Sequence, residues 1–322
     1  MRKIFLLLTL CYLSSCTPNE SKNGDKKIPV VGFLDYVNDA TLARAKQGFY
    51  DALKANGYIE DSGTVKIIYR NANGDQPTML QSCEYILAQH PDLIATNPTL
   101  PTITAVQKTK DVPVFMMVSP RPDIAKLTDA NGKAPANLFG TYETLDYIDT
   151  AVALIKTVFP NAKKIGTIYN QSEPQSVDAM NRLQSLCERH GFTFEKLPVN
   201  NTNEAQLVTA ALLHKKIDAF FALPDNIVFS AMEVIVKECD AAHVPVFTSE
   251  EGLVKRGALA GFGADMYQWG YQSGVQAALF LKTKSTAGMK PEIVQVRRRV
   301  YNPTKAKILK ISFDSAFVAI GN

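Results

Sequence analysis

The sequence predicts an α/β fold of two similar Rossmann-like lobes, whose parallel sheets are joined by hinge strands. The chain has 322 residues, which is the size of two ordinary domains rather than one. Short apolar runs rich in β-branched residues alternate with amphipathic stretches, a pattern typical of parallel sheets covered by helices. The same order of strand, polar loop and helix occurs twice, which indicates that both lobes share one design.

Four glycines mark the repeat most clearly. In the first half, Gly32 lies in a strand-like run and Gly57 ends a helical pattern 25 residues later. In the second half, Gly166 and Gly191 occupy the same two places at the same spacing. Two further strand-like runs recur in the same order, DLIAT at 92–96 with DAFFA at 218–222, and VPVF at 112–115 with VPVF at 244–247.

The apolar runs give the expected strands and lobe boundaries in chain order. Lobe one should contain strands 28–35, 64–70, 92–96 and 113–118, and lobe two strands 163–169, 192–199, 217–222 and 245–248. A strand at 257–262, a helix at 267–282 and strands at 292–300 and 306–311 should then cross back between the lobes. We expect lobe one to span 28–143 plus 255–290 and lobe two 144–254 plus 291–322, with hinges at 142–144, 248–253 and 285–291.

The N-terminus has the pattern of an export signal. Arg2 and Lys3 precede the apolar run 4–13, which is too short to cross a bilayer. The run ends in LSSC, which resembles the bacterial lipobox and predicts lipidation of Cys16, so 1–16 is expected to be a lipoprotein signal peptide. Residues 17–27 are polar and fit a flexible tether to the membrane. The alternative is a plain signal peptide with a chance cysteine.

Composition points away from nucleic acid, metals and redox chemistry. The net charge is only +4, and the basic run at 297–299 is flanked by Val294, Val296 and Val300 at alternating, strand-like positions, which favours a solvated strand edge over an anion site. Cys83, Cys187 and Cys239 have no metal-ligand spacing and lie in helix-like apolar stretches, so we expect buried thiols. We expect no cofactor and no metal, and a monomer.

The usual catalytic motifs are missing from the sequence. It has no HExxH, GxSxG or GxxxxGK[ST] pattern, so hydrolase and nucleotide-dependent activities lose their ordinary support and no catalytic residue is assigned. Glu250 and Glu251 are adjacent, and neighbouring side chains point in different directions, so only one of them is expected to face a cleft.

The loops that follow the strands offer polar groups suited to a small zwitterion. In parallel sheets such loops meet at the carboxyl edge, where helix N-termini supply free N–H groups for a carboxylate. The loops 96–99 and 170–176 should face each other across the cleft, and Asp225 could accept hydrogen bonds from an ammonium group. Each loop residue could instead cap its helix, but convergence of three loops favours a ligand site. Aromatic side chains beside these loops are Tyr36, Phe139, Tyr142 and Tyr169, with core packing the alternative for Phe139.

The chain from about residue 28 to 313 resembles the ABC transporter substrate-binding family that includes tryptophan- and tyrosine-binding lipoproteins. The resemblance is carried by VGFLDYVND at 31–39, GFYDALKANGY at 48–58, DLIATNPT at 92–99, DVPVFMMVSP at 111–120, KKIGTIYNQSEPQS at 163–176, DAFFALPDNIVFSA at 218–231 and GALAGFGADMYQWG at 257–270. It implies a type I periplasmic-binding fold with ligand in the interlobe cleft. The positions it places near ligand are Asn97, Thr99, Asn170, Glu173, Ser176, Asp225 and Asn226. We add Tyr36, Tyr142, Glu250 and Asp265 as candidate ligand contacts.

The resemblance implies binding without catalysis, in an exported protein that delivers ligand to an ABC permease and its ATPase. The expected ligand is an aromatic or large apolar amino acid, with its carboxylate at the two helix starts and its ammonium on Asp225. Arg121 departs from the family's usual turn and adds a cation near the cleft mouth. The alternatives are a sensor module for a membrane receptor, a binder of a sugar or another polar metabolite, and an enzyme with two Rossmann-like lobes.

Overall fold

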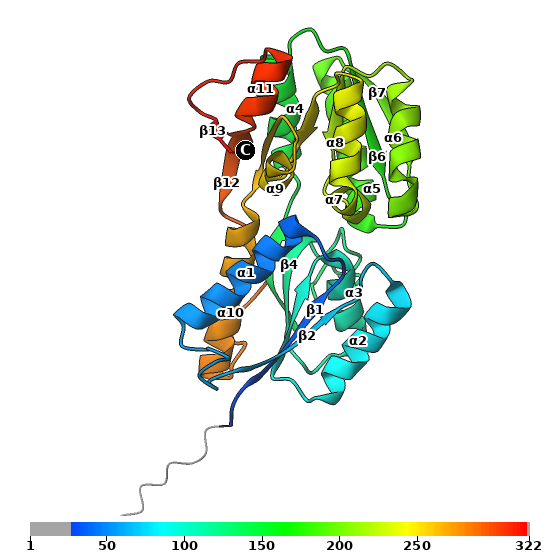
Figure 1. The fold of residues 1–322 in the computed structure, drawn as a ribbon. Helices are drawn as coiled ribbons and strands as arrows, with labels where there is room; N and C mark the ends of the chain where they lie inside the picture. The colour runs from blue at the N-terminus through cyan, green and yellow to red at the C-terminus, as the bar shows by residue number, and fades with distance from the viewer. Residues whose placement is uncertain (1–26, 321–322) are drawn as a thin grey trace, which may run out of the picture.

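The computed structural model describes residues 27–320, which form two α/β units, each built on its own sheet (Figure 1). The expected signal peptide, the lipidation of Cys16 and all of the tether except residue 27 fall outside this range. No helix within 27–320 is both long and apolar enough to cross a membrane.

Lobe one, the first sheet with its helices, has six strands that all run parallel, in the order β11-β5-β4-β3-β1-β2. Their bounds are β1 Val30–Asp35, β2 Lys66–Asn71, β3 Leu93–Asn97, β4 Val114–Pro120, β5 Leu138–Glu143 and β11 Glu292–Ile293. Every residue of β3 and β4 is buried, because helices cover both faces of the sheet. These helices are α1 Ala40–Ala55, α2 Gln76–Ala88, α3 Thr99–Lys108 and α10 Met266–Thr283.

Helices α1 and α10 lie against each other on one side of the first sheet, with α2 and α3 on the other (Figure 1). Their contact is unusually close. A Cβ atom at Gly270 would lie 1.7 Å from the carbonyl oxygen of Ala45, and one at Gly48 would lie 2.0 Å from that of Tyr267. Glycine at these two positions therefore lets the helix backbones touch, and α10 becomes part of the wall of lobe one.

Lobe two, the second sheet with its helices, has seven strands in the order β13-β12-β10-β9-β8-β6-β7. All neighbours are parallel except β10 and β12, which are antiparallel. The strands are β6 Lys164–Tyr169, β7 Thr193–Pro198, β8 Ala219–Ala222, β9 Val246–Thr248, β10 Ala260–Ala264, β12 Arg297–Tyr301 and β13 Val318–Ala319. The helices are α4 Tyr147–Val158, α5 Pro174–His190, the 3-10 turn η1 Thr202–Glu204, α6 Ala205–Leu213, α7 Asn226–Ser230, α8 Met232–Ala241, α9 Glu251–Lys255 and α11 Pro303–Leu309.

The predicted repeat is confirmed. Strand β1 and helix α1 correspond to β6 and α5, and each helix is followed by its glycine in the left-handed region, at φ 86° for Gly57 and 76° for Gly191. Other residues adopt this conformation only at a cost, so glycine is the natural residue to end both helices. The two-lobed α/β fold was therefore predicted correctly.

The crossings between the sheets differ in part from the expected hinges. The chain leaves lobe one after Glu143, close to the expected hinge at 142–144. It returns between Ala264 and Met266 rather than at 248–253, because β10 pairs with β9 in the second sheet. It crosses again between β11 and β12, since β11 pairs with β5 in the first sheet. Residues 255–264 therefore lie with lobe two and 291–293 with lobe one, which corrects our boundaries.

Three local expectations were wrong. Residues expected as a strand at 306–311 belong mostly to helix α11, which Asn302 caps through a bond to the Lys305 N–H and which has proline at its first position. Strand β5 was not among the expected strands. The arginines at 297–299 are in a strand as expected, but β12 lies between β10 and β13 and is not an edge.

Candidate ligand-binding site

A narrow cavity lies between the carboxyl edges of the two sheets, and the space between its lining atoms, including open solvent, is about 340 Å³. Residues from both lobes and from the first crossing line it, so it exists only while the lobes are together. Its lining residues are Pro98, Thr99, Val118, Pro120, Leu145, Tyr147, Gln175, Pro224, Asn226, Phe229, Glu250 and Trp269.

Three aromatic side chains form part of the cavity wall. Tyr147 comes from the first turn of α4, Phe229 from α7 and Trp269 from the first turn of α10. All three are buried, and the Trp269 Nε1–H donates to the carbonyl of Thr141 at 3.0 Å, which fixes the orientation of its ring. Rings held in this way suit a flat or large apolar group, because they offer apolar area with little motion left to lose.

Two lining residues have strained backbones. Val118 has φ 50° and Leu145 has φ 64°, although branched side chains rarely occupy this left-handed region. Val118 lies in an irregular stretch of β4, where the pairing with β5 shifts register between Met116 and Ser119. Strain of this kind costs of order 1–3 kcal/mol and gathers at functional sites. Both residues face the same cavity, which links the strain to the site.

Two helix starts, one from each lobe, reach the cavity. Thr99 begins α3 after Pro98, and Gln175 is the second residue of α5 after Glu173 as N-cap. Neither N-cap side chain bonds to the first turn of its helix. The first N–H groups of a helix have no acceptor inside the helix, so they can donate to a ligand carboxylate. The structure thus places a residue from each of the loops 96–99 and 170–176 at one cavity, and their binding of a carboxylate stays a prediction.

Two buried polar atoms of lining residues lack a partner within residues 27–320. They are Oε2 of Glu250 and Oε1 of Gln175. The other oxygen of Glu250 accepts a hydrogen bond from the Tyr147 hydroxyl at 3.3 Å. Burial raises the pKa of Glu250 well above its ordinary value, and the nearby carboxylate of Glu143 raises it further. A buried acid with a free oxygen is a natural partner for a cation.

Three of the expected contact residues line the cavity, namely Thr99, Glu250 and Asn226. Asn97 ends β3 beside it, where its Nδ2 donates to the Leu42 carbonyl at 3.2 Å and its Oδ1 has no partner in the described chain. The sequence argument that one of the adjacent glutamates faces a cleft thus fits Glu250, while Glu251 faces elsewhere.

Asp225 does not line the cavity and is occupied by four protein donors. One oxygen caps α7 by accepting from the N–H groups of Ile227 at 2.7 Å and Val228 at 3.0 Å. The other accepts from the Asn170 N–H at 2.7 Å and the Ser176 hydroxyl at 2.5 Å. Capping, which the sequence left as the alternative, therefore describes Asp225, while Asn170 and Ser176 donate to its second oxygen.

Glu173 lies in the same buried network, directly behind the cavity. It accepts hydrogen bonds from the side chains of Asn170 at 3.2 Å and Asn226 at 3.0 Å, and from the amide of Gln175. Burial and the neighbouring charge of Asp225 raise the pKa of Glu173 to about 8, and burial also raises the pKa of Asp225. The network holds two lining residues, Gln175 and Asn226, in place.

The other expected contacts lie apart from the cavity. The hydroxyl of Tyr36 donates to the Gly74 carbonyl at 2.9 Å within lobe one, and Tyr142 is a half-buried residue of β5. Asp265 caps α10 through the Gln268 N–H at 3.0 Å. Arg121 is exposed and pairs with Asp123 at 2.8 Å, so it is engaged on the surface.

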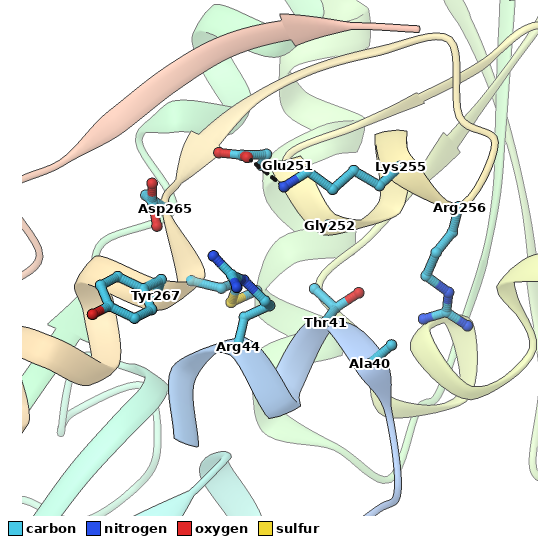
Figure 2. Close-up of a pocket in the computed structure, with 10 residues that line it drawn as sticks. Ala40, Thr41, Arg44, Glu251, Gly252, Lys255, Arg256, Asp265 and Tyr267 are labelled. Carbon is cyan, nitrogen blue, oxygen red and sulfur yellow. Dashed lines mark ion pairs between the residues drawn. The ribbon is translucent and has the colours of Figure 1, made fainter. Parts of the chain in front are cut away.

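Asp265 instead lines a second, more open pocket of about 620 Å³ between α1, α9 and α10 (Figure 2). Glu251 lies at this pocket, where it pairs with Lys255 at 3.0 Å. The pocket is lined by Ala40, Thr41, Arg44, Glu251, Gly252, Lys255, Arg256, Asp265, Met266 and Tyr267. Nowhere in residues 27–320 do three acidic, histidine or cysteine side chains gather so as to hold a metal.

Sequence reasoning did not assign Gln175, Tyr147, Phe229, Val118 or Leu145 to the site. Gln175 could have been assigned to the site from the sequence, because it adjoins Ser176 in a loop already selected. Tyr147 and Phe229 lie in helices and look like ordinary core residues in the sequence. Trp269, the only tryptophan, stood out in composition but not as a lining residue.

Comparison with known proteins identifies a matching protein family and several similar proteins. The sequence profile described as "ABC transporter substrate binding protein" matches residues 29–320. A protein named "Tyrosine-binding protein" from Clostridioides difficile is 30% identical over 320 residues, which cover 96% of this chain and 92% of that protein.

Three solved structures resemble the whole fold. A conserved domain protein from Vibrio cholerae has a TM-score of 0.85 at 28% identity and covers 92% of this chain and 100% of its own. A Streptococcus pneumoniae ABC domain in complex with L-Trp has a TM-score of 0.81 at 27% identity, with 89% and 96% covered. A ligand-free, open substrate-binding protein from Clostridium difficile has a TM-score of 0.68 at 27% identity, with 92% and 100% covered.

Proposed function

The chain belongs to the ABC transporter substrate-binding protein family, and from this premise we propose that its cavity binds an aromatic or large apolar α-amino acid for import. The observation that carries the proposal is the free oxygen of Glu250, which lies buried in a cavity that also has two uncapped helix starts and aromatic walls. The cavity thus offers a group for the ammonium, for the carboxylate and for the side chain of an amino acid.

The ligand carboxylate is assigned to the N–H groups at the starts of α3 and α5, and the ammonium to Glu250 Oε2. Gln175 Oε1, the other unpartnered oxygen of a lining residue, is a second acceptor for the ammonium. A zwitterion buried in a closed cleft needs both charges paired, because leaving either unpaired is costly. Asp225, whose oxygens are already engaged, no longer has this role in the proposal.

The ligand side chain would lie against Tyr147, Phe229 and Trp269. The printed names of two relatives, which mention tyrosine and L-Trp, support an aromatic ligand. We propose that the arrangement of the lobes in this structure, with one cavity lined from both sides, is the closed form.

A binding screen tests the proposal directly. The chain from residue 17 onward is titrated calorimetrically with L-tyrosine, L-tryptophan, L-phenylalanine and L-leucine, and with ribose and inositol. We expect micromolar or tighter binding of at least one aromatic amino acid, and a rise in Tm that follows its concentration. Binding of a sugar with no response to any amino acid would overturn the assignment.

The rest of the proposal concerns how the protein is held at the membrane and which transporter subunits receive its ligand. We propose that Cys16 carries the lipid that anchors the protein outside the cytoplasm, and that an ABC permease with its ATPase receives the ligand. Mass spectrometry of the membrane-extracted protein tests the anchor, with Cys16→Ser expected to lose both the lipid and membrane retention. Ligand-dependent stimulation of the permease's ATPase in proteoliposomes distinguishes import from a sensor function.

A further inference from the structure

An ion pair joins the two lobes through residues that belong to none of the three crossings. Asp39 precedes α1 in lobe one, and Arg256 follows α9 in lobe two. Arg256 Nη1 lies 2.5 Å from Asp39 Oδ2. The rest of the guanidinium is held by Glu233 of α8, with Nε to Oε1 at 2.7 Å and Nη2 to Oε2 at 2.7 Å. One arginine is thus anchored within lobe two and reaches across to lobe one.

The pair is fixed at both ends and sheltered from water. The side chain of Asp39 is 1% exposed and that of Arg256 is 14% exposed. Asp39 uses its other oxygen to cap α1, accepting from the N–H groups of Thr41 at 2.8 Å and Leu42 at 2.9 Å. Because both partners are already oriented, their charge-assisted bond needs little further ordering when the lobes meet.

The backbones of α1 and α9 also meet beside the ion pair. A Cβ atom at Gly252 would lie 2.4 Å from Thr41 Cγ2 and 2.7 Å from Thr41 Oγ1, so any side chain at 252 would collide with lobe one. Figure 2 shows Thr41 in the first turn of α1 below α9, with Arg256 reaching down from the end of α9. Separation of the lobes along this face must break both contacts.

This contact lies close in sequence to the ligand site but faces away from it. Glu250, which lines the ligand cavity, is the N-cap residue of α9, while Gly252 and Arg256 line the second pocket. Neither Asp39 nor Arg256 lines the ligand cavity. An effect of these residues on affinity would therefore act through the position of α9 and the lobes.

We propose that Asp39 and Arg256 form an interlobe clasp that holds the closed form and so sets how slowly ligand leaves. The inference rests on the proposed function for its ligand, and it adds a pair of positioning residues that do not touch the ligand. A contact made only in the closed form lowers the dissociation rate and leaves the encounter of ligand with the open form unchanged.

The test compares Arg256→Gln and Asp39→Asn with a matched control inside one lobe. Asparagine still caps a helix, so Asp39→Asn removes the charge and keeps the cap. Arg182 is the control, because it too is held by two carboxylates, Asp149 at 2.6 Å and Asp146 at 2.6 Å, both in lobe two. With L-tyrosine and L-tryptophan as probes, stopped-flow fluorescence should show dissociation about tenfold faster in both clasp variants, with association within twofold of wild type. Arg182→Gln should change neither rate.

Two outcomes overturn the clasp. One is an unchanged dissociation rate in both variants, and the other is an equal acceleration in Arg182→Gln. If none of the four amino acids of the binding screen binds the wild type, the proposed function fails, and small-angle X-ray scattering of the ligand-free proteins then decides the clasp. A larger radius of gyration in Asp39→Asn than in wild type and Arg182→Gln supports the clasp, and equal radii overturn it.

Discussion

The hydroxyl of Tyr147 donates to one carboxylate oxygen of Glu250 at 3.3 Å, and the other oxygen of Glu250 has no partner among residues 27–320. Replacing Glu250 by glutamine keeps its size and removes its negative charge. We expect Kd for the preferred amino acid to rise tenfold or more, because a hydrogen bond to a charged group contributes about 1.5–3 kcal/mol. Calorimetric titration measures the change.

Glu251→Gln is the control for this substitution. Glu251 is the next residue, but it pairs with Lys255 at 3.0 Å and Arg298 at 3.3 Å at the second pocket. Its replacement should leave Kd within about threefold of wild type. Equal losses in the two variants would remove Glu250 from the ammonium site.

Ligand binding should release a proton. Burial raises the pKa of Glu250 well above its ordinary value, which means that the empty site favours the neutral acid. An ammonium group favours the ionised form and expels the proton, so affinity should rise with pH until Glu250 ionises without ligand. Calorimetry in two buffers of different ionisation enthalpy counts the protons. The Glu250→Gln protein should release none, and equal release from both proteins would assign the proton to another group.

Val118→Gly should cost far less stability than Val114→Gly. Both residues are buried valines of β4, but only Val118 has a positive φ, at 50°. Glycine relieves about 1–3 kcal/mol of backbone strain at Val118, which offsets the lost packing. At Val114 nothing offsets a loss of about 3 kcal/mol. Thermal unfolding of the two ligand-free variants gives the comparison, and similar Tm losses would show that the strain at Val118 is small.

Glu173→Gln should flatten the pH dependence of stability. The pKa of Glu173 is raised from 4.5 to about 8 in the folded protein. Between these values the folded chain keeps a proton that the unfolded chain has lost, so stability falls as pH rises through this window. Glutamine cannot ionise, so the fall in Tm between pH 5 and pH 8 should shrink. Glu204→Gln is the control, because hydrogen bonds from Asn200 lower the pKa of Glu204 instead of raising it. If Tm falls as steeply with pH in Glu173→Gln as in wild type, the raised pKa of Glu173 is contradicted.

The three thiols in the described chain should be unreactive in the native protein. Cys83, Cys187 and Cys239 are free and buried, and burial raises the pKa of Cys83 to about 11 and of Cys187 to about 12. A chain that begins at residue 17 should therefore not react with DTNB until it is unfolded, because the thiolate is the reactive form. Ser185→Cys, at an exposed position of α5, supplies the reactive control. Rapid labelling of the parent chain would show that α2, α5 or α8 opens locally in the native protein, because each thiol is buried within its own lobe.

The fold could be predicted from sequence because the repeat is local. Strands β1 and β6, their helices and the closing Gly57 and Gly191 each follow from short-range patterns. Short-range patterns do not show which sheet a late strand joins. The sequence of β10 would look the same whether the strand paired with lobe one or with lobe two. Pairing with β9 is a long-range choice, and the expected lobe boundary at 255 was wrong for that reason.

The site was predictable only where it is built from loops. Thr99, Asn226 and Glu250 follow strands, and the order of elements places them at the cavity. The polar sequence of a loop cannot distinguish a ligand contact from a cap, and Asp225 proved to be a cap with four donors. Tyr147 and Trp269 come from helices, and only three-dimensional packing brings them to the cavity.

The backbone contact between α1 and α10 governs the order in which the protein can assemble. Lobe one begins at the N-terminus, but its outer wall is α10, a helix from the last fifth of the chain. Until residue 283 has emerged, Ala45 and Gly48 lack the helix that packs closest against them, and β5 lacks its partner β11 until residue 293. A fragment that stops at Glu143 is thus not an independent lobe, so lobe one can be completed only after the chain of lobe two up to β10 has emerged.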